Sequence, residues 1–271
     1  MPEENPVVSV VITVYNAEKF IERTLRSVMN QTIKNIEIIC VNDCSIDKSE
    51  EIIKILMQED DRIVLLNNEQ NLKVSQTRNK GINYAHAKFI ALLDSDDEWK
   101  ENFLIAMLER QKETGGRVIY SACSFMTSDG TYLPATFIPK DKVTYKEYFK
   151  QNIIPPSGSL IERELLIKYP FYADKVHEDY VCFLSILKEI KVAYGIKEPL
   201  MIYRLTDGSK SRNKFKAILM SYRTYKIHGV SFFRRCFYTI CNAINGIKKY
   251  GKINKVKREF LKERENKNGQ S

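Results

Sequence analysis

The chain has 271 residues, of which 44% are apolar and 28% are charged. A chain of this length and composition can bury a hydrophobic core, which excludes an intrinsically disordered or fibrous protein. The net charge of +9 is concentrated at one end, because residues 210–271 hold 17 Lys or Arg against 3 acidic residues, whereas the first 209 residues hold 26 against 31. We therefore expect a slightly acidic domain followed by a basic tail.

The six cysteines form no CxxC pair, and several lie in apolar runs such as IEIICVN. This usage is typical of reduced, buried cysteine and not of a disulfide framework or a zinc site. The opening residues, MPEENP, show no secretory signal, and no run approaches the roughly 20 apolar residues of a spanning helix. These features predict a cytoplasmic protein.

Apolar runs rich in β-branched residues alternate with segments whose apolar residues recur at helical spacing. Strands are predicted at 7–14, 36–42, 62–68 and 88–94, and the helices after them at 17–31, 45–59, 74–85 and 98–113. Ser45 or Asp47 is the expected cap of the second helix. Such alternation is typical of an α/β fold with a mostly parallel sheet and helices on both faces.

After residue 115 the pattern is less regular. We expect a strand at 117–126, a turn into a further strand at 128–134, a helix near 144–151, a Pro/Gly-rich loop leading to a strand and short helix at 155–169, a helix at 177–190, and a strand leaving a polar loop at 198–213. The predicted organisation is one domain over residues 1–212 and a basic, amphipathic helical tail over 213–271.

Polar residues follow three of the predicted strands. Tyr15-Asn16 follows the first strand, Asp43 the second, and the sequence DSDD at 94–97 the fourth. In parallel sheets, ligands bind outside the carboxyl ends of the strands. Three carboxylates within four positions repel one another, and hard oxygen ligands of this kind suit a divalent cation. The sequence therefore predicts a ligand site at this edge.

Four segments, in order, resemble glycosyltransferase family 2, which has the GT-A fold. The likeness covers roughly residues 7–212. The segments are VVITVYNAEKFIERTLRSVMNQT, IICVNDCSIDKS, QTRNKGINYAHAKFIALLDSDD and HEDYVCFL. The third contains the Asp94-Ser95-Asp96 that matches the family's metal-binding DxD motif. The QxxRW motif of processive synthases is absent, so the resemblance implies a single transfer onto a growing surface glycan or a lipid-linked acceptor.

The resemblance implies a nucleotide-diphosphate sugar donor, UDP-linked by preference, and a Mn²⁺ or Mg²⁺ cofactor. Asp96 is then the direct metal ligand, and Asp94 lies near the ribose or holds the metal through water. Asp97 either supports this loop or caps the next helix, and Lys80 has a surface role. The residues expected to bind the nucleotide sugar are Tyr15, Asn16, Asp43, Arg78, Asp94, Ser95, Arg204, Ser209 and Ser211.

The resemblance also assigns an acceptor side. In an inverting transfer a base removes the proton of the acceptor hydroxyl. The family's Glu-Asp pair maps to Glu178, expected to orient the acceptor, and Asp179, expected to be the base. Arg204 and the serines that follow it, with Arg212, are expected in a loop that closes over the diphosphate. The chain has Leu205-Thr206 where many members carry a histidine two residues after the Tyr-Arg pair.

The basic tail allows two interpretations. Its aromatic and aliphatic residues form either a helix packed on the domain or an interfacial helix attracted to anionic lipid. The residues expected on its apolar face are Phe232, Phe233, Phe237, Tyr238, Ile240, Cys241, Ile244 and Ile247.

Two other functions compete with sugar transfer. A nucleic-acid-binding protein would use the basic tail, but the remaining domain is acidic. A nucleotidyltransferase shares the sheet and the carboxylates, yet normally has a glycine-rich loop after the first strand, and VYNAEKF contains no glycine.

Overall fold

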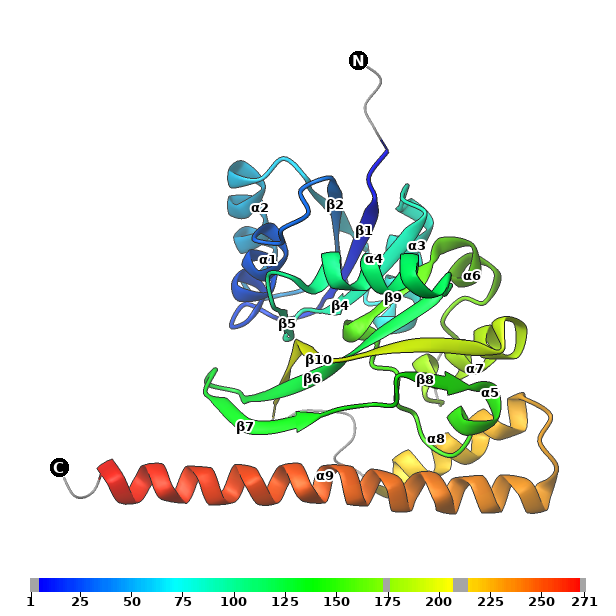
Figure 1. Ribbon diagram of the computed structural model, residues 1–271. Coiled ribbons are helices and arrows are strands. Elements are labelled where there is room, and N and C mark those ends of the chain that lie inside the picture. The colour runs from blue at the N-terminus through cyan, green and yellow to red at the C-terminus, as the bar shows by residue number, and fades with distance from the viewer. Residues whose placement is uncertain (1–4, 173–175, 207–213, 269–271) are drawn as a thin grey trace.

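The structure is a computed structural model that describes residues 5–172, 176–206 and 214–268, with the side chains of 214–216, 249–250 and 263–268 left aside. Ten strands of the described chain form one sheet in the order β3-β2-β1-β4-β9-β6-β10-β5, with β7 paired to β6 and β8 to β10 (Figure 1). The bounds are β1 Val8–Val14, β2 Ile36–Asn42, β3 Ile63–Asn67, β4 Phe89–Asp94, β5 Glu98–Trp99, β6 Val118–Thr127, β7 Tyr132–Phe137, β8 Lys142–Thr144, β9 Ser159–Glu162 and β10 Val192–Leu205.

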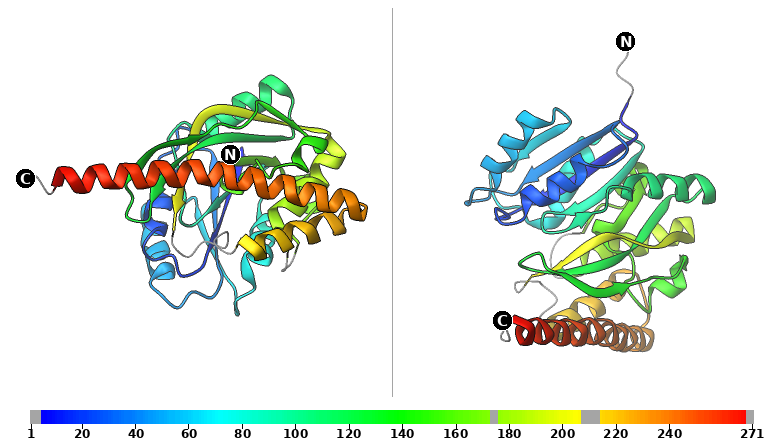
Figure 2. Two further views of the ribbon diagram at one scale, coloured as in Figure 1. Left: turned by 90° about the horizontal axis from the view of Figure 1, so that it is seen from below. Right: turned by 60° about the vertical axis from the view of Figure 1, so that its left-hand side comes forward.

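Helices cover both faces of this sheet (Figure 2). One core packs α1, α2 and α4 against the sheet, and the second core packs α3, α5, α6 and α7 against the other face. The bounds are α1 Ile21–Met29, α2 Ser49–Glu59, α3 Lys73–Tyr84, α4 Phe103–Thr114, α5 Tyr145–Tyr148, η1 Pro156–Gly158, α6 Arg163–Lys168, α7 Glu178–Ile190, α8 Lys214–Ile227 and α9 Phe232–Asn268.

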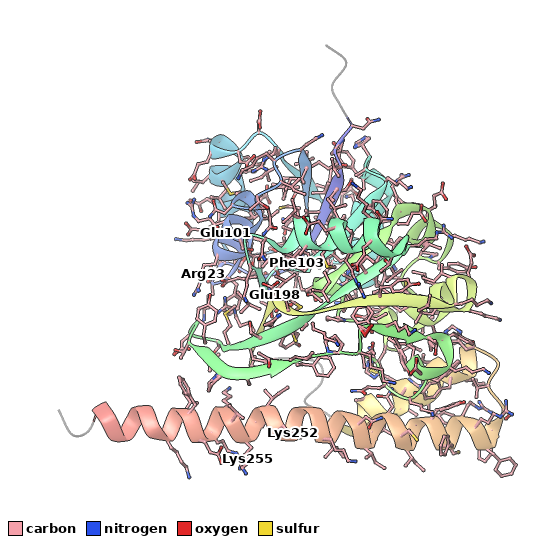
Figure 3. The ribbon with its side chains drawn as sticks, in the orientation of Figure 1. Arg23, Glu101, Phe103, Glu198, Lys252 and Lys255 are labelled. Carbon is pink, nitrogen blue, oxygen red and sulfur yellow. The ribbon has the colours of Figure 1, made fainter. Side chains whose placement is uncertain are left out.

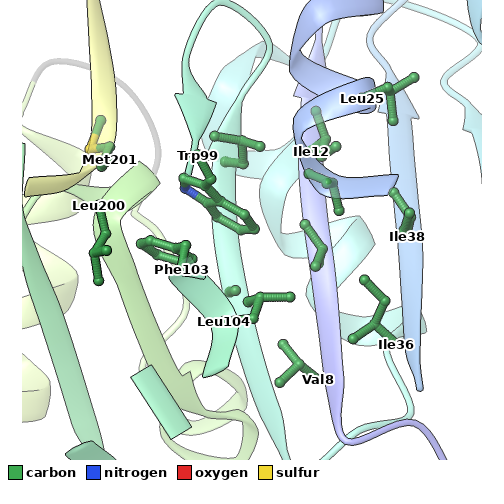
Figure 4. Packing of buried hydrophobic residues seen from close by; sticks show 14 of the residues in the cluster. Val8, Ile12, Leu25, Ile36, Ile38, Trp99, Phe103, Leu104, Leu200 and Met201 are labelled. Carbon is green, nitrogen blue, oxygen red and sulfur yellow. The ribbon is translucent and has the colours of Figure 1, made fainter. Parts of the chain in front are cut away.

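The first four strands are parallel and end at the same level. β1 lies between β2 and β4, with Val14 opposite Asn42 and Thr13 opposite Asp94. Alternate residues of β1 enter opposite cores, because successive side chains of a strand point to opposite faces. Val8 and Ile12 pack with Leu25 of α1 in the first core (Figure 4). The predicted α/β sheet is confirmed here, and the aligned ends place the three polar loops along one edge.

Gly81 sets how closely α3 approaches the sheet. A Cβ atom at this position would lie 2.5 Å from Val11 Cγ1 and 3.0 Å from Val41 Cγ2. Any larger side chain would therefore push α3 away from β1 and β2. Because residues three apart lie on neighbouring parts of a helix surface, this close approach also fixes the position of Arg78.

Several predicted boundaries were wrong, and the helix expected at 17–31 spans only Ile21–Met29. The helix expected at 98–113 begins at Phe103, because Glu98-Trp99 forms β5, an edge strand paired with β10. The helix expected at 45–59 begins at Ser49 without a side-chain cap. The last strand extends back to Val192, with register shifts around Pro199, and forward to Leu205, which removes Arg204 from the loop expected there.

The tail forms two helices that pack on the domain. α9 lies beneath β7, with α8 beside it (Figures 1 and 2). Tyr225 of α8 and Ile253 of α9 are buried and belong to the two cores. Tyr238, one of the residues expected on the apolar face of the tail, stacks on Phe149 with ring centroids 5.2 Å apart, as the interpretation of a packed helix predicts. None of the helices in the described part of the chain combines the length and apolar content needed to cross a bilayer.

Candidate active site

Asn16 helps to hold the loops after β1 and β2 together. Asn16 adopts the left-handed conformation, with φ of 49°. Its backbone N–H donates to Ser45 Oγ at 3.0 Å, and its Oδ1 accepts from the Ile46 N–H at 3.0 Å. Tyr15 beside it is 53% exposed at the edge of the sheet. The predicted pair Tyr15-Asn16 therefore lies at the ends of the strands. The Asn16 side chain also connects the loop after β1 to the loop after β2.

Asp43 is buried and organises the start of α3. Its Oδ1 accepts from the Leu72 N–H at 2.7 Å and from Asn68 Nδ2 at 2.9 Å, and its Oδ2 accepts from the Lys73 N–H at 2.9 Å. The turn after β2 is made by Asn42, whose Oδ1 accepts from the Ser45 N–H at 3.2 Å. Both oxygens of Asp43 thus already have partners, while its contact with a ribose stays a prediction.

Lys80 extends the same network on α3. Its Nζ donates to the Asn67 carbonyl oxygen at 2.7 Å and to Asn68 Oδ1 at 2.9 Å. The lysine therefore fixes the loop after β3, which leads to the residues bound by Asp43.

Arg78 connects α3 to the acidic loop. Its Nη2 donates to Asp94 Oδ1 at 2.6 Å, and its guanidinium lies 4.7 Å from the centre of the Phe171 ring. The Arg78 side chain is 4% exposed, whereas that of Asp94 is 39% exposed. A buried cation therefore holds one carboxylate oxygen of Asp94, and the side chain stays accessible from solvent.

The rest of the acidic loop is fixed by Arg204. This residue is 2% exposed in β10, where its backbone N–H donates to Asp97 Oδ1 at 3.0 Å. Its Nε donates to the Asp96 carbonyl oxygen at 2.8 Å, and its Nη2 donates to Glu98. We expected Arg204 in a mobile loop, but it lies in β10 and its guanidinium donates hydrogen bonds to groups inside the protein. Ser209, Ser211 and Arg212 lie outside the described residues.

Asp97 faces the interior and does not cap a helix. It is 2% exposed, and α4 begins only after Asn102. Burial and the charges of Asp96 and Asp94 raise the pKa of Asp97 well above its usual value, while hydrogen bonds from Arg204 and Ser157 oppose this shift. The Asp97 carboxylate is therefore a support for the loop, which was one of its two expected roles, and the helix-capping alternative was wrong.

Asp94 and Asp96 fit a divalent cation by the chemistry of their groups. Burial and the neighbouring Asp94 charge raise the pKa of Asp96 to about 6. A cation beside the pair would favour the ionised form, because an opposite charge stabilises a carboxylate. Within the described residues, no group of three or more His, Cys, Asp or Glu is arranged to hold a metal. Asp94 and Asp96 are therefore the two carboxylates of this loop that could hold such an ion.

Asp179, the aspartate expected on the acceptor side, lies in the first turn of α7, two residues after the N-cap residue His177. Asp179 Oδ2 accepts from Asn152 Nδ2 at 2.9 Å, and Oδ1 accepts from the Tyr180 N–H at 2.8 Å. The Tyr148 hydroxyl in turn donates to Asn152 Oδ1. Asp179 is partly exposed, as is Glu178. The Asp179 carboxylate is therefore held in one orientation by Asn152, which is itself held by Tyr148.

His177, the N-cap residue of α7, contacts the tail. Its Nε2 lies 3.1 Å from the carbonyl oxygen of Ala217 in α8. The ring therefore links the start of α7 to the first helix of the tail.

Sequence reasoning missed several residues that assemble the site. Asn79 clamps the segment before α7 to α3, because its Nδ2 and Oδ1 bind the Phe171 carbonyl oxygen and N–H at 3.0 and 2.9 Å. The Ser157 hydroxyl accepts from the Asp94 N–H at 3.1 Å. The Thr24 hydroxyl lies 2.9 Å from the Ser95 carbonyl oxygen and 2.8 Å from that of Asp97. Only Ser157, in the PPSGS loop, had a local sequence signal.

An α/β sheet with carboxylates at the end of β4 and a second carboxylate site on a following helix is the architecture of a GT-A glycosyltransferase. The family model described as "Glycosyl transferase family 2" matches residues 9–169. The chain therefore belongs to glycosyl transferase family 2, and it is a glycosyltransferase. The predicted family and enzyme class are confirmed, and neither the nucleic-acid-binding nor the nucleotidyltransferase interpretation is supported.

Relatives of similar length support this assignment. The chain is 33% identical over 250 residues to the Bacillus subtilis protein named putative teichuronic acid biosynthesis glycosyltransferase TuaG, covering 92% of this chain and 99% of that protein. It is 32% identical over 246 residues to the Escherichia coli UDP-Glc:alpha-D-GlcNAc-diphosphoundecaprenol beta-1,3-glucosyltransferase WfgD, covering 90% of this chain and 95% of that protein.

Solved structures confirm the GT-A fold. S. aureus TarS 1–349 in complex with UDP-GlcNAc matches with a TM-score of 0.67 at 18% identity, over 81% of this chain and 64% of that one. The mannosyltransferase PcManGT from Pyrobaculum calidifontis, in complex with GDP-Man and Mn²⁺, matches with a TM-score of 0.64 at 14% identity, over 83% of this chain and 64% of that one.

Proposed function

We propose that the protein transfers one sugar from a UDP-sugar to a hydroxyl of a lipid-linked acceptor during the synthesis of a surface polysaccharide, with inversion at the anomeric carbon. The observation that carries this proposal is the loop after β4, where Asp94 and Asp96 lie at the carboxyl end of a parallel strand beside buried Arg78. The name of WfgD specifies a UDP-sugar donor and a lipid-linked acceptor, and TuaG is named for a surface glycan.

The donor would lie across the ends of β1, β2 and β4. Tyr15 and the backbone of Asn16 would frame the base, and Asp43 would accept a hydrogen bond from a ribose hydroxyl or from an N–H of the base. Asp96 is the direct ligand of a Mn²⁺ or Mg²⁺ ion, with Asp94 beside it. The metal supplies Lewis-acid stabilisation of the charge that develops on the β-phosphate when the glycosidic bond to the nucleotide breaks.

Asp179 would act on the acceptor. Its carboxylate takes the proton of the acceptor hydroxyl while the oxygen forms a bond to the anomeric carbon and UDP leaves with the electron pair of the broken bond. Asn152 and Tyr148 keep the carboxylate in one orientation, and Glu178 in the same first turn orients the acceptor. We place this reaction in the cytoplasm, at the inner face of the cell membrane, where a lipid-linked acceptor is accessible.

The first test is thermal unfolding of the protein with UDP, GDP, CDP or ADP, each with and without Mn²⁺. A ligand at 100 times its dissociation constant stabilises by about 2.7 kcal/mol, which raises the midpoint temperature measurably. We expect a shift with UDP that needs Mn²⁺ and that Asp96→Asn removes. A shift with GDP and not with UDP would mean that the donor is a GDP-sugar. No shift with any combination of nucleotide and metal would contradict the donor site.

The second test separates donor binding from transfer. Asp179→Asn removes the proposed base and keeps the size of the side chain. We expect the variant to retain its stabilisation by UDP with Mn²⁺ and to lose transfer to the acceptor by at least about 1,000-fold. Wild-type turnover in this variant would show that Asp179 is not the base.

A further inference from the structure

The long helix α9 has one side fixed on the domain. Tyr238 stacks on Phe149, Asn242 Nδ2 donates to the Tyr225 hydroxyl at 3.2 Å, and Ile253 is 4% exposed in the core. Asn245 Nδ2 also donates to the Lys150 carbonyl oxygen at 3.0 Å. These contacts are spread over several turns, so they determine which residues of the helix point away from the domain.

The outward side of α9 begins with an apolar stripe. Its five large side chains are between 47% and 84% exposed. Soluble proteins rarely expose several neighbouring large apolar side chains in one patch. Their spacing of four, three, four and three residues places them on one face of a helix. The stripe consists of Phe233, Phe237, Ile240, Ile244 and Ile247.

The same face becomes basic towards the carboxyl end. Residues 18 positions apart are five full turns apart and point in the same direction. Lys255, which is 18 residues after Phe237, points away from the domain in Figure 3. Positions 18 residues after the first four members of the stripe are exposed Gly251, Lys255, Arg258 and Lys262. Glu259, whose carboxylate lies 3.9 Å from Lys255 Nζ, is the acidic residue among the described side chains of α9.

A second helix of the tail, α8, packs against α9. Seen from below, α8 lies beside α9 on the same underside of the molecule (Figure 2). The underside therefore has two helices side by side, one of them with an outward face that changes from apolar to basic.

We propose that this face of α9 lies on the surface of an anionic lipid bilayer. The apolar stripe enters the boundary between headgroups and acyl chains, and Lys255, Arg258 and Lys262 lie over the lipid phosphates. An exposed apolar row joined to a basic one is the chemistry of a helix that lies in a membrane interface. Anionic lipids of the cytoplasmic leaflet attract basic segments of this kind.

A second copy of the chain fits this face less well. The stripe spans about two heptads, whereas a stable coiled coil needs about three or four. Among the described side chains of α9, the basic half would find Glu259 as its acidic counterpart on the same helix of a partner. Nucleic acid would satisfy the lysines but would leave the phenylalanines and isoleucines in water. The anionic bilayer is the partner that matches both halves.

The test is sedimentation of the full-length protein with vesicles of phosphatidylcholine alone or mixed with phosphatidylglycerol. Two variants change the face: Ile240→Glu with Ile244→Glu, and Lys255→Glu with Arg258→Glu. Matched controls change exposed residues of the same types elsewhere, Ile167→Glu in α6 and Lys112→Glu in α4. Thermal unfolding of each variant, with and without UDP and Mn²⁺, verifies that it is folded.

We expect the wild type to sediment with the mixed vesicles and not with phosphatidylcholine alone. Each double variant should lower the vesicle-bound fraction by more than about tenfold, and added salt should mimic the basic variant. The control variants should bind like the wild type. A wild type that stays in the supernatant with mixed vesicles would overturn the proposal.

The oligomeric state provides a second way to overturn the proposal. If light scattering shows a dimer that Ile240→Glu with Ile244→Glu converts to a monomer, and vesicle binding is unchanged, the face is a subunit interface. Because the vesicle experiment contains neither donor nor acceptor, its outcome is independent of the proposed sugar transfer.

Discussion

The donor side and the proposed acceptor side of the molecule are held in place by different means. On the proposed donor side, the parallel register of β1, β2 and β4 brings three loops to one edge, where side chains such as Asp43 bind backbone N–H groups of a neighbouring loop. On the acceptor side, Asp179 is oriented by Asn152 and Tyr148 from a separate segment. Backbone register tolerates most substitutions, whereas a chain of side-chain hydrogen bonds fails when one member changes.

The largest effect on the donor side is expected for Asp96→Asn. Removing the proposed metal ligand should lower transfer by at least about 1,000-fold, since the charge on the leaving phosphate would lose its Lewis acid. Initial rates at saturating Mn²⁺ measure this effect. Rates within a few-fold of the wild type would show that Asp96 does not serve the reaction.

The same variant should not destabilise the metal-free protein. Because the pKa of Asp96 is raised to about 6 in the folded state, its contribution to stability is complete below pH 3.8 and is lost as the pH rises through 6. Asparagine resembles the protonated acid and avoids this loss. With EDTA, the variant should gain up to about 1–3 kcal/mol over the wild type above pH 6, and the gain should vanish near pH 4. Denaturant unfolding at both pH values measures it.

Gly81→Ala tests how closely α3 packs on β1 and β2, the strands of the proposed donor side. The added methyl group would collide with Val11 and Val41, so α3 must move away from the sheet. We expect a loss of about 1–3 kcal/mol in the free energy of unfolding, measured in urea. Gly246→Ala is the matched control, because nothing lies within 4 Å of its added Cβ; it should be neutral or slightly stabilising. Equal effects at the two positions would contradict the close approach of α3.

Asn152→Ala tests the chain of hydrogen bonds from Tyr148 through Asn152 to Asp179 on the proposed acceptor side. Without its donor, the Asp179 carboxylate can rotate, so kcat should fall about tenfold while the KM for the donor stays unchanged. Tyr148→Phe should have a smaller effect in the same direction, because it removes only the support of Asn152. A change in donor KM with unchanged kcat would place Asn152 on the donor side instead.

The smallest effect is expected for Tyr225→Phe. The lost hydroxyl lies 3.0 Å from that of Tyr180 and donates to the Phe149 carbonyl oxygen at 2.7 Å. Leaving buried partners unsatisfied should cost about 1 kcal/mol of stability, measured by thermal unfolding. If kcat falls as well, the tail influences the position of Asp179 through its neighbour Tyr180; an unchanged kcat would limit its role to stability.

The sequence predicted the strands of the proposed donor side well because their signals are local. Apolar runs mark β1, β2 and β4, and the polar residues that follow them must meet once the strands are parallel. Arg204 was misplaced because Tyr-Arg-Leu before a polar segment looks like a strand leaving for a loop, while its partners Asp97 and Glu98 are more than a hundred residues earlier. The hydrogen bond between Asn152 and Asp179 has no periodicity or motif, so only the folded chain shows it.

The buried hydroxyl of Tyr225 limits how far this enzyme can be taken apart. Tyr225 binds Phe149 after α5, Tyr180 in α7 and Asn242 in α9, so four segments share one side chain. A chimera that joined this sheet to the carboxyl-terminal helices of a relative would have to exchange all these partners together. The tail is thus not a module that can be swapped to redirect the enzyme, and redesign for a new acceptor would have to begin with the surface residues of α7 that leave this junction intact.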